Sequence, residues 1–185
     1  LVERLRAAFP AHSIESEEAV RDAPARGPRW FLDPLDGTTN FVHGHPFWCV
    51  SIGLVVEATP VLGVVVAPAL GLEWFGYLSP AGQGRAVRCP LDGTSGEERC
   101  TVSAMSRFED ALLATGFPYD RKTSRENNFD AFVAIKKQCQ AVRRCGSAAL
   151  DLCLVADGTY EGYWERKLRP WDIAGGIAIV RASGG

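Results

Sequence analysis

Two aspartates stand three residues apart in the segment Asp33-Pro-Leu-Asp-Gly-Thr-Thr-Asn-Phe41. Asp followed by Pro favours a tight turn, whose ends come within about 7 Å of each other. We therefore expect Asp33 and Asp36 to converge, with the carbonyl of Leu35 pointing at the space between them. Two carboxylates that close repel each other and stay ionised only when a cation lies between them. Because hard ions such as Mg2+ prefer oxygen ligands, the segment predicts a metal site.

The residues that follow the two aspartates suit the binding of an anion. Gly37 permits backbone angles that other residues rarely adopt, and Thr38, Thr39 and Asn40 suit the first turn of a short helix. Free N–H groups at a helix start attract phosphate, and a metal ion beside them would bind the same anion. Aspartates that merely cap a turn are the alternative, which the continuation Gly-Thr-Thr-Asn-Phe makes the weaker one.

Other acidic residues have an ordinary structural explanation beside the functional one. Asp172 follows Pro170 at the expected start of a helix, where the helix dipole favours acids in any protein. Glu17 and Glu18 lie in a charged stretch that is typical of a solvated loop. Glu165 follows a predicted strand and could equally be an exposed loop acid. From the residues alone these alternatives stay open.

Histidines and basic residues are weaker candidates. His43 and His45 could form a metal pair, but they suit softer metals than the neighbouring aspartates do. Four basic residues are interpreted as a solvated face, with phosphate or partner contacts as the minor alternative: Lys136, Lys137, Arg143 and Arg144.

The elements that must position these residues divide the chain into two halves. The first half is rich in strands, expected at 29–32, 50–56, 61–67 and 73–78. The Gly-, Pro- and charge-rich stretch 79–99 is expected to be an exposed loop or hairpin. The second half alternates, with strands near 110–115, 140–144 and 159–164 and helices near 124–138, 147–157 and 171–182. This alternation predicts an α/β half. We therefore expect one α/β domain over residues 1–185, with sub-domains of about 1–100 and 101–185 and the site in the cleft between them.

Composition narrows the class of protein. Hydrophobic residues make up 46% and charged residues 23% of the chain, as in ordinary soluble domains. The net charge of −2 gives no reason to expect nucleic-acid or membrane binding, and the apolar runs are shorter than the roughly 18 residues of a membrane-spanning helix. The six cysteines form no Cys-x-x-Cys pair, which favours buried free thiols in a reducing compartment. We expect a cytoplasmic protein, unless an organelle address precedes this chain.

The segment at 33–41 resembles the first signature of the inositol monophosphatase family, and three further segments resemble this family in the same order. They are Glu17-Glu18, Cys145–Ala149 with Leu152–Gly158, and Trp171–Gly175 with Ala182–Gly185. The resemblance implies an α+β layered sandwich of the inositol monophosphatase and fructose-1,6-bisphosphatase type, in which a mixed-sheet half precedes a smaller α/β half. It also implies hydrolysis of a small phosphomonoester, first of all myo-inositol monophosphate. The implied cofactor is Mg2+, as two or three ions, and homodimers are frequent in the family.

On this chain the resemblance implies two metal sites that share Asp33. Glu17 and the Leu35 carbonyl would complete the first site, and Asp36 and Asp172 would complete the second. The alternative for the first site is a shift by one residue, from Glu17 to its neighbour Glu18.

The resemblance also assigns roles in catalysis and substrate binding. The hydroxyl of Thr38 would orient the attacking water, with Asp33 and Asp36 as the other catalytic residues. The N–H groups of Gly37 and Thr38 would hold the phosphate. The backbone of Gly146, Ser147 and Ala148 would face the polyol ring, and Glu165 would hydrogen-bond its hydroxyls.

Several alternatives remain beside this reading. Sugar-phosphate and histidinol-phosphate phosphatases share the Asp-Pro-x-Asp-Gly core. The family pattern also includes an aspartate from N-terminal helices and a continuation beyond Gly185, neither of which this chain contains. We therefore also consider a fragment, or a truncated homologue without catalytic activity.

Overall fold

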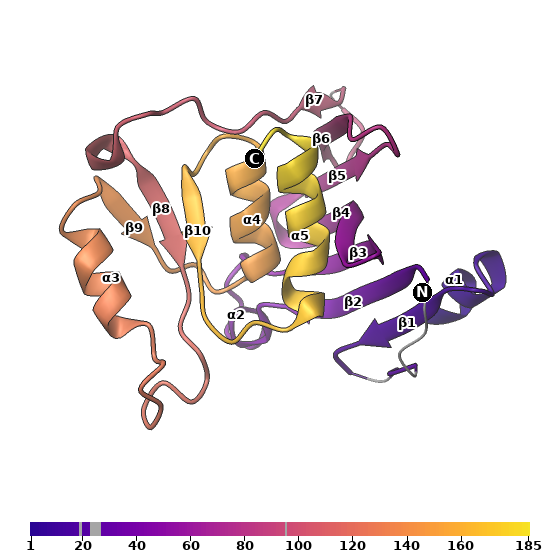
Figure 1. Cartoon of the computed structure of the whole chain (residues 1–185), viewed down its shortest axis with the longest axis horizontal. Helices are drawn as coiled ribbons and strands as arrows, with labels where there is room; N and C mark the ends of the chain where they lie inside the picture. The colour runs from indigo at the N-terminus through magenta and orange to yellow at the C-terminus, as the bar shows by residue number, and fades with distance from the viewer. Residues whose placement is uncertain (19, 23–26, 95) are drawn as a thin grey trace.

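The computed structural model describes residues 1–18, 20–22, 27–94 and 96–185. These residues form a seven-stranded and a three-stranded β-sheet, with two helices lying between them (Figure 1). The layered, mixed α/β fold class predicted from the sequence is confirmed.

The larger sheet is built from the first hundred residues. Its strands lie side by side in chain order: β1 (Ser13–Ser16), β2 (Arg29–Asp36), β3 (Cys49–Val56), β4 (Thr59–Ala67), β5 (Leu72–Leu78), β6 (Gly84–Pro90) and β7 (Glu98–Arg99). β1 pairs parallel with β2, and the later neighbours pair antiparallel. The predicted strands of this half coincide with β2 to β5.

The smaller sheet is entirely parallel, in the order β10-β8-β9. Its strands are β8 (Leu112–Thr115), β9 (Ala141–Arg143) and β10 (Gly162–Trp164). The helices are α1 (Val2–Ala8), α2 (Thr38–Val42), α3 (Phe129–Lys136), α4 (Ala148–Ala156) and α5 (Pro170–Ala182), with 3-10 turns η1 (Pro68–Leu70) and η2 (Phe108–Asp110). Among these helices, none is long and apolar enough to cross a membrane; the statement covers the described residues.

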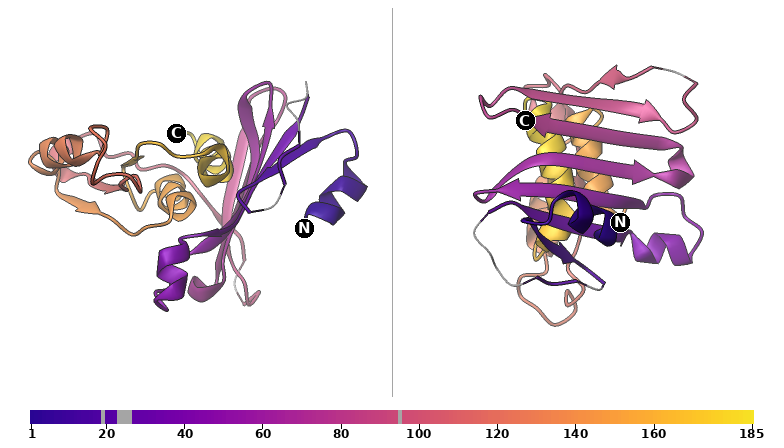
Figure 2. Two further views of the ribbon diagram at one scale, coloured as in Figure 1. Left: turned by 90° about the horizontal axis from the view of Figure 1, so that it is seen from below. Right: turned by 90° about the vertical axis from the view of Figure 1, so that its right-hand side faces the viewer.

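Helices α4 and α5 cover one face of the larger sheet, while α1 lies on its other side (Figure 2). Two strand glycines allow α5 to lie close to the sheet. A Cβ on Gly53 would lie 2.6 Å from the Ala174 Cβ, and one on Gly63 would overlap the Gly175 carbonyl. Between sheet and helices lies a core that includes the buried side chains of Trp74, Val65, Leu150 and Ile179. This close packing brings the amino end of α5 next to β2.

The prediction of a tight turn at Asp33–Asp36 is wrong. β2 continues through Asp36, and its register against β3 shifts between Asp33 and Asp36. Pro34 has no N–H to donate to the neighbouring strand, which favours such an irregularity. The Leu35 N–H instead donates a hydrogen bond to Asp33 Oδ1 at 2.9 Å. This bond from the backbone two residues on to an Asp side chain is an Asx-turn.

Three further segments differ from the expectation. The stretch 79–99 contains the full strand β6, whose Ala86 and Val87 are buried, besides the short β7. α3 begins only at Phe129, because Asn128 before it has a left-handed backbone with φ of 71°. The charged stretch around residues 15–18 was expected to be a loop, yet Ser16 is buried in β1.

Candidate functional site

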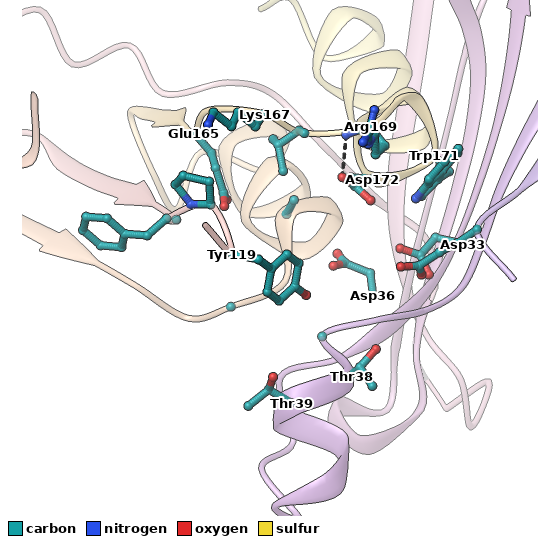
Figure 3. Close-up of a pocket in the computed structure, with 18 of the residues that line it drawn as sticks. Asp33, Asp36, Thr38, Thr39, Tyr119, Glu165, Lys167, Arg169, Trp171 and Asp172 are labelled. Carbon is teal, nitrogen blue, oxygen red and sulfur yellow. Dashed lines mark hydrogen bonds between the residues drawn. The ribbon is translucent and has the colours of Figure 1, made fainter. Parts of the chain in front are cut away.

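A cavity of about 530 Å3 lies where both sheets end. It is lined from the carboxyl ends of β1, β2 and the three parallel strands, and from the amino ends of α4 and α5. Helix amino ends favour anions, and ligands of open α/β sheets bind beyond the carboxyl ends of the strands. The acidic residues of the wall are Glu17, Asp33, Asp36, Asp120, Glu165 and Asp172. Figure 3 shows the Asp33, Asp36 and Asp172 carboxylates turned toward this space.

Asp33 is the most deeply buried of these acids, with 2% of its surface exposed. Its position in β2 fixes its backbone, and the bond from the Leu35 N–H holds one carboxylate oxygen. Burial, and after it the nearby charge of Asp36, raises the pKa of Asp33 to about 8. Without a cation, burial and the charge of Asp36 therefore favour the protonated form of Asp33.

Asp36 is held from the other half of the chain. Its Oδ2 accepts hydrogen bonds from the Ser147 hydroxyl and the Ala149 N–H, both at 2.7 Å. Ser147 also caps α4, accepting from the Leu150 N–H at 3.4 Å. Burial raises the pKa of Asp36 to about 6, although these two hydrogen bonds favour the charged form.

Asp172 stands in the first turn of α5, as predicted. Its Oδ2 accepts from the Arg169 N–H at 2.6 Å, which fixes the carboxylate at the helix start. Burial raises the pKa of Asp172, and the Arg169 hydrogen bond opposes the rise. Trp171 beside it packs on Phe31 and Ala174.

Glu165 follows β10 and forms the opposite wall of the cavity. The Tyr163 hydroxyl donates to its Oε2. Burial raises the pKa of Glu165, while the Tyr163 bond and the charge of Arg144 oppose this. Glu165 is therefore fixed in position by its hydrogen bond with Tyr163, and it is not an exposed acid of a loop.

Glu17, Leu35 and Thr38 complete the predicted set on the cavity wall. The Glu17 N–H donates to the Leu32 carbonyl at 3.2 Å, which anchors its backbone beside β2. Glu17 lines the cavity, and its neighbour Glu18 is not part of the lining among the described residues. The Thr38 hydroxyl donates to the Leu35 carbonyl at 3.1 Å.

The short helix α2 begins where predicted, after Gly37 with φ of 95°. A Cβ at this position would lie 3.0 Å from the Phe47 carbonyl, so a side chain would be strained for two reasons. Asn40 fixes α2 to the second half of the chain. Its side-chain amide donates to the carbonyls of Phe47 at 2.6 Å and Cys145 at 2.8 Å.

The resemblance implies a polyol-facing backbone at Gly146, Ser147 and Ala148. Gly146 and Ala148 line the cavity, but Ser147 is 1% exposed and its hydroxyl binds Asp36. Its side chain therefore positions a carboxylate. His43 and His45 lie in an exposed stretch after α2, away from the cavity lining.

Sequence reasoning missed several groups on the cavity wall. Tyr119 had no periodic or motif signal, and Arg144 was taken for part of a solvated face. The remaining unforeseen cations of the lining are Arg21, Arg121, Arg166, Lys167 and Arg169. Positive charge beside the acidic wall suits a substrate that carries an anion.

The donor set fits a hard cation in its chemistry. The groups are oxygens, and the repulsion between Asp33 and Asp36 that raises the pKa of Asp33 would be relieved by a divalent ion. In the described part of the chain, however, no three acidic, histidine or cysteine side chains stand close enough to hold an ion as they are placed. Metal ligation by these residues is therefore a proposal.

Fold and site together define a layered α/β protein with an acidic cavity at the ends of its two sheets. The sequence matches the model of the inositol monophosphatase family over residues 1–185, and the chain belongs to this family.

Known relatives agree with this assignment. Inositol-1-monophosphatase from Synechocystis sp. is 42% identical over all of this chain and 61% of its own length. A fructose-1,6-bisphosphatase/inositol-1-monophosphatase from Aquifex aeolicus is 33% identical over 96% of this chain and 63% of its own. The solved inositol monophosphatase from Anabaena (Nostoc) sp. superposes with a TM-score of 0.82 at 38% identity, over 99% of this chain and 69% of the other. The chain thus spans less than two thirds of the curated relatives described here.

Proposed function

We propose that this protein hydrolyses a small phosphomonoester to an alcohol and inorganic phosphate, with Mg2+ as cofactor and myo-inositol monophosphate as the preferred substrate. The observation that carries the proposal is the common cavity of Asp33, Asp36 and Asp172, which also receives the amino ends of α4 and α5. Carboxylates attract cations and helix amino ends attract anions, so the cavity suits a metal ion together with a phosphate.

Glu17, Asp33, Asp36, Asp172 and the Leu35 carbonyl would hold the ions. Bound Mg2+ supplies positive charge that lowers the pKa of water and offsets the negative charge of the phosphate and the leaving oxygen.

The residues of α2 and its preceding turn orient the reactants. The N–H groups of Gly37 and Thr38 would hold phosphate oxygens. The Thr38 hydroxyl donates its hydrogen bond to the Leu35 carbonyl, so its oxygen is free to accept a hydrogen bond from the attacking water and to orient that water toward phosphorus. Ser147 and the Ala149 N–H keep Asp36 in place during this attack.

Substrate choice would rest on the wall opposite the aspartates. Glu165, held by Tyr163, can accept hydrogen bonds from hydroxyls of a polyol. A sugar-phosphate or sugar-bisphosphate is the second candidate, because the cavity wall carries several cations besides the acidic groups and the Aquifex relative is named for both activities. The six free thiols suit a reducing compartment such as the cytoplasm, and a homodimer is proposed on the resemblance alone.

Phosphate release with and without Mg2+ tests the proposal, using inositol 1-phosphate, fructose 1,6-bisphosphate, histidinol phosphate and glycerol 2-phosphate. We expect Mg2+-dependent release, fastest with inositol 1-phosphate. Asp36→Asn should lower kcat about 100-fold. Asp130→Asn, at an exposed aspartate on α3, is the matched control and should leave kcat unchanged. Equal activity of Asp36→Asn and wild type would exclude the metal-dependent mechanism, and release from none of the four esters would favour an inactive homologue.

A further inference from the structure

Tyr119 projects into the cavity from the segment that follows β8 (Figure 3). The side chain is 94% exposed, so the protein leaves both faces of its ring largely open. In Figure 3 the ring lies between Glu165 on one side and Asp36 with Thr38 on the other. An exposed aromatic side chain is ordinary by itself. Its significance depends on whether the protein holds it in place.

The segment that carries Tyr119 is held by a lysine from the segment that follows β10, the strand paired with β8. Lys167 Nζ donates to Asp120 Oδ2 and to the Ser124 hydroxyl, both at 2.7 Å. Lys167 itself has a left-handed backbone with φ of 64°, a costly conformation for a residue with a side chain. The Arg121 N–H closes a turn around Tyr119 by donating to the Pro118 carbonyl at 3.1 Å. The residues next to Tyr119 are therefore bound on both sides.

The base of the loop is tied just as firmly. The buried Asn128 side chain donates to the Gly116 carbonyl at 2.7 Å and accepts from Trp164 Nε1 at 3.0 Å. Phe117 packs on Phe129, with ring centroids 5.0 Å apart. Residues 117–128 thus form a compact loop whose two ends meet, a type of loop that is frequently functional. A turn near the start of this loop carries the open Tyr119 ring.

We propose that Tyr119 is a specificity residue that packs its ring against the carbon face of a cyclic polyol phosphate. A tyrosine offers an apolar ring and a polar hydroxyl at the same time, which matches a sugar-like ring with C–H faces and hydroxyl edges. The other side of the polyol would meet Glu165, so the two residues would hold the ring between them. Linear alcohols present no such face and gain little from Tyr119. This inference rests on the proposed phosphatase function.

The test compares a cyclic with a linear ester in the same assay. Tyr119→Ala should lower kcat/KM for inositol 1-phosphate about 10-fold, mainly through KM, and change it less than about threefold for glycerol 2-phosphate. Tyr119→Phe, which keeps the ring, should retain most of the preference for the cyclic ester. Tyr77→Ala is the control, since Tyr77 is an exposed tyrosine on β5 outside the cavity lining. Thermal melting of each variant reports on folding.

Asp120→Asn tests the loop attachment without touching Tyr119. It weakens the bond to Lys167, and the preference for inositol 1-phosphate over glycerol 2-phosphate should fall in the same direction as in Tyr119→Ala. If Tyr119→Ala changes both esters equally, or neither, the specificity role is wrong while the phosphatase function stands. A wild-type protein that releases phosphate from neither ester would overturn the function and this inference together.

Discussion

Glu165 reaches the cavity because the residue facing it has no side chain. A Cβ on Gly116 would overlap the Glu165 carboxylate, so these two positions, 49 residues apart, depend on each other. Gly116 needs no unusual backbone angle here; what matters is space. The same carboxylate accepts a hydrogen bond from the Tyr163 hydroxyl, which limits the movement of the Glu165 side chain. At the scale of single residues, one glycine therefore sets the position of a proposed substrate ligand.

Gly116→Ala should displace Glu165 and lower kcat/KM for inositol 1-phosphate about 10-fold, because a displaced ligand misplaces the substrate. Gly96→Ala is a matched control, since a Cβ there meets nothing within 4 Å. Steady-state kinetics on both variants check this. Unchanged kinetics in Gly116→Ala, with folding intact, would show that Glu165 does not position the substrate.

At the scale of elements, the sequence predicted what local patterns encode. The strands β3 to β5 and the helix α5 follow from apolar runs and from Pro170, and all five expected metal ligands line one cavity. Contacts between distant residues were beyond such reasoning. Ser147 lies 111 residues from Asp36, and no local sequence pattern around either residue predicts their hydrogen bond. Likewise β1 depends on pairing with β2 for its burial, so its charged sequence suggested a loop.

The contact of α5 with the larger sheet is the second long-range feature. Gly63 on β4 leaves room for the Gly175 carbonyl, and this contact places the first turn of α5, with Asp172, beside β2. From the sequence alone, a glycine in the middle of a strand indicates only a lower strand propensity. The contact that it allows with a helix could therefore not be predicted.

Gly63→Ala should push α5 outward and lower the free energy of unfolding by about 1–3 kcal/mol, the usual cost of overpacking. Because Asp172 moves with α5, Mg2+ affinity should fall as well. Denaturant unfolding and Mg2+ titration measure the two effects, with Gly96→Ala again as the control. If the stability falls while Mg2+ affinity stays the same, Asp172 does not contribute to metal binding.

At the scale of the whole molecule, the proposed ions would join parts that the chain brings together only by folding. Glu17 follows β1, Asp33 and Asp36 belong to β2, and Asp172 belongs to α5. Without an ion these acids oppose folding, since burial raises the pKa of Asp33 to about 8 and that of Asp36 to about 6. The unfolded chain loses these protons near pH 4, whereas the folded chain keeps them to higher pH. Metal-free stability should therefore fall as the pH rises from about 4 to about 8.

Mg2+ reverses this trend, because an ion binds the ionised carboxylates and must displace the protons that they hold. The rise in Tm on adding Mg2+ should be small at pH 5.5 and large at pH 8, where 100 times the Kd stabilises by about 2.7 kcal/mol. Thermal melts with Mg2+ or with EDTA across this pH range measure it. In Asp33→Asn the rise should be much smaller at pH 8, since the shared ligand has lost its charge. A Mg2+ effect of equal size at both pH values would mean that the ions bind outside this cavity.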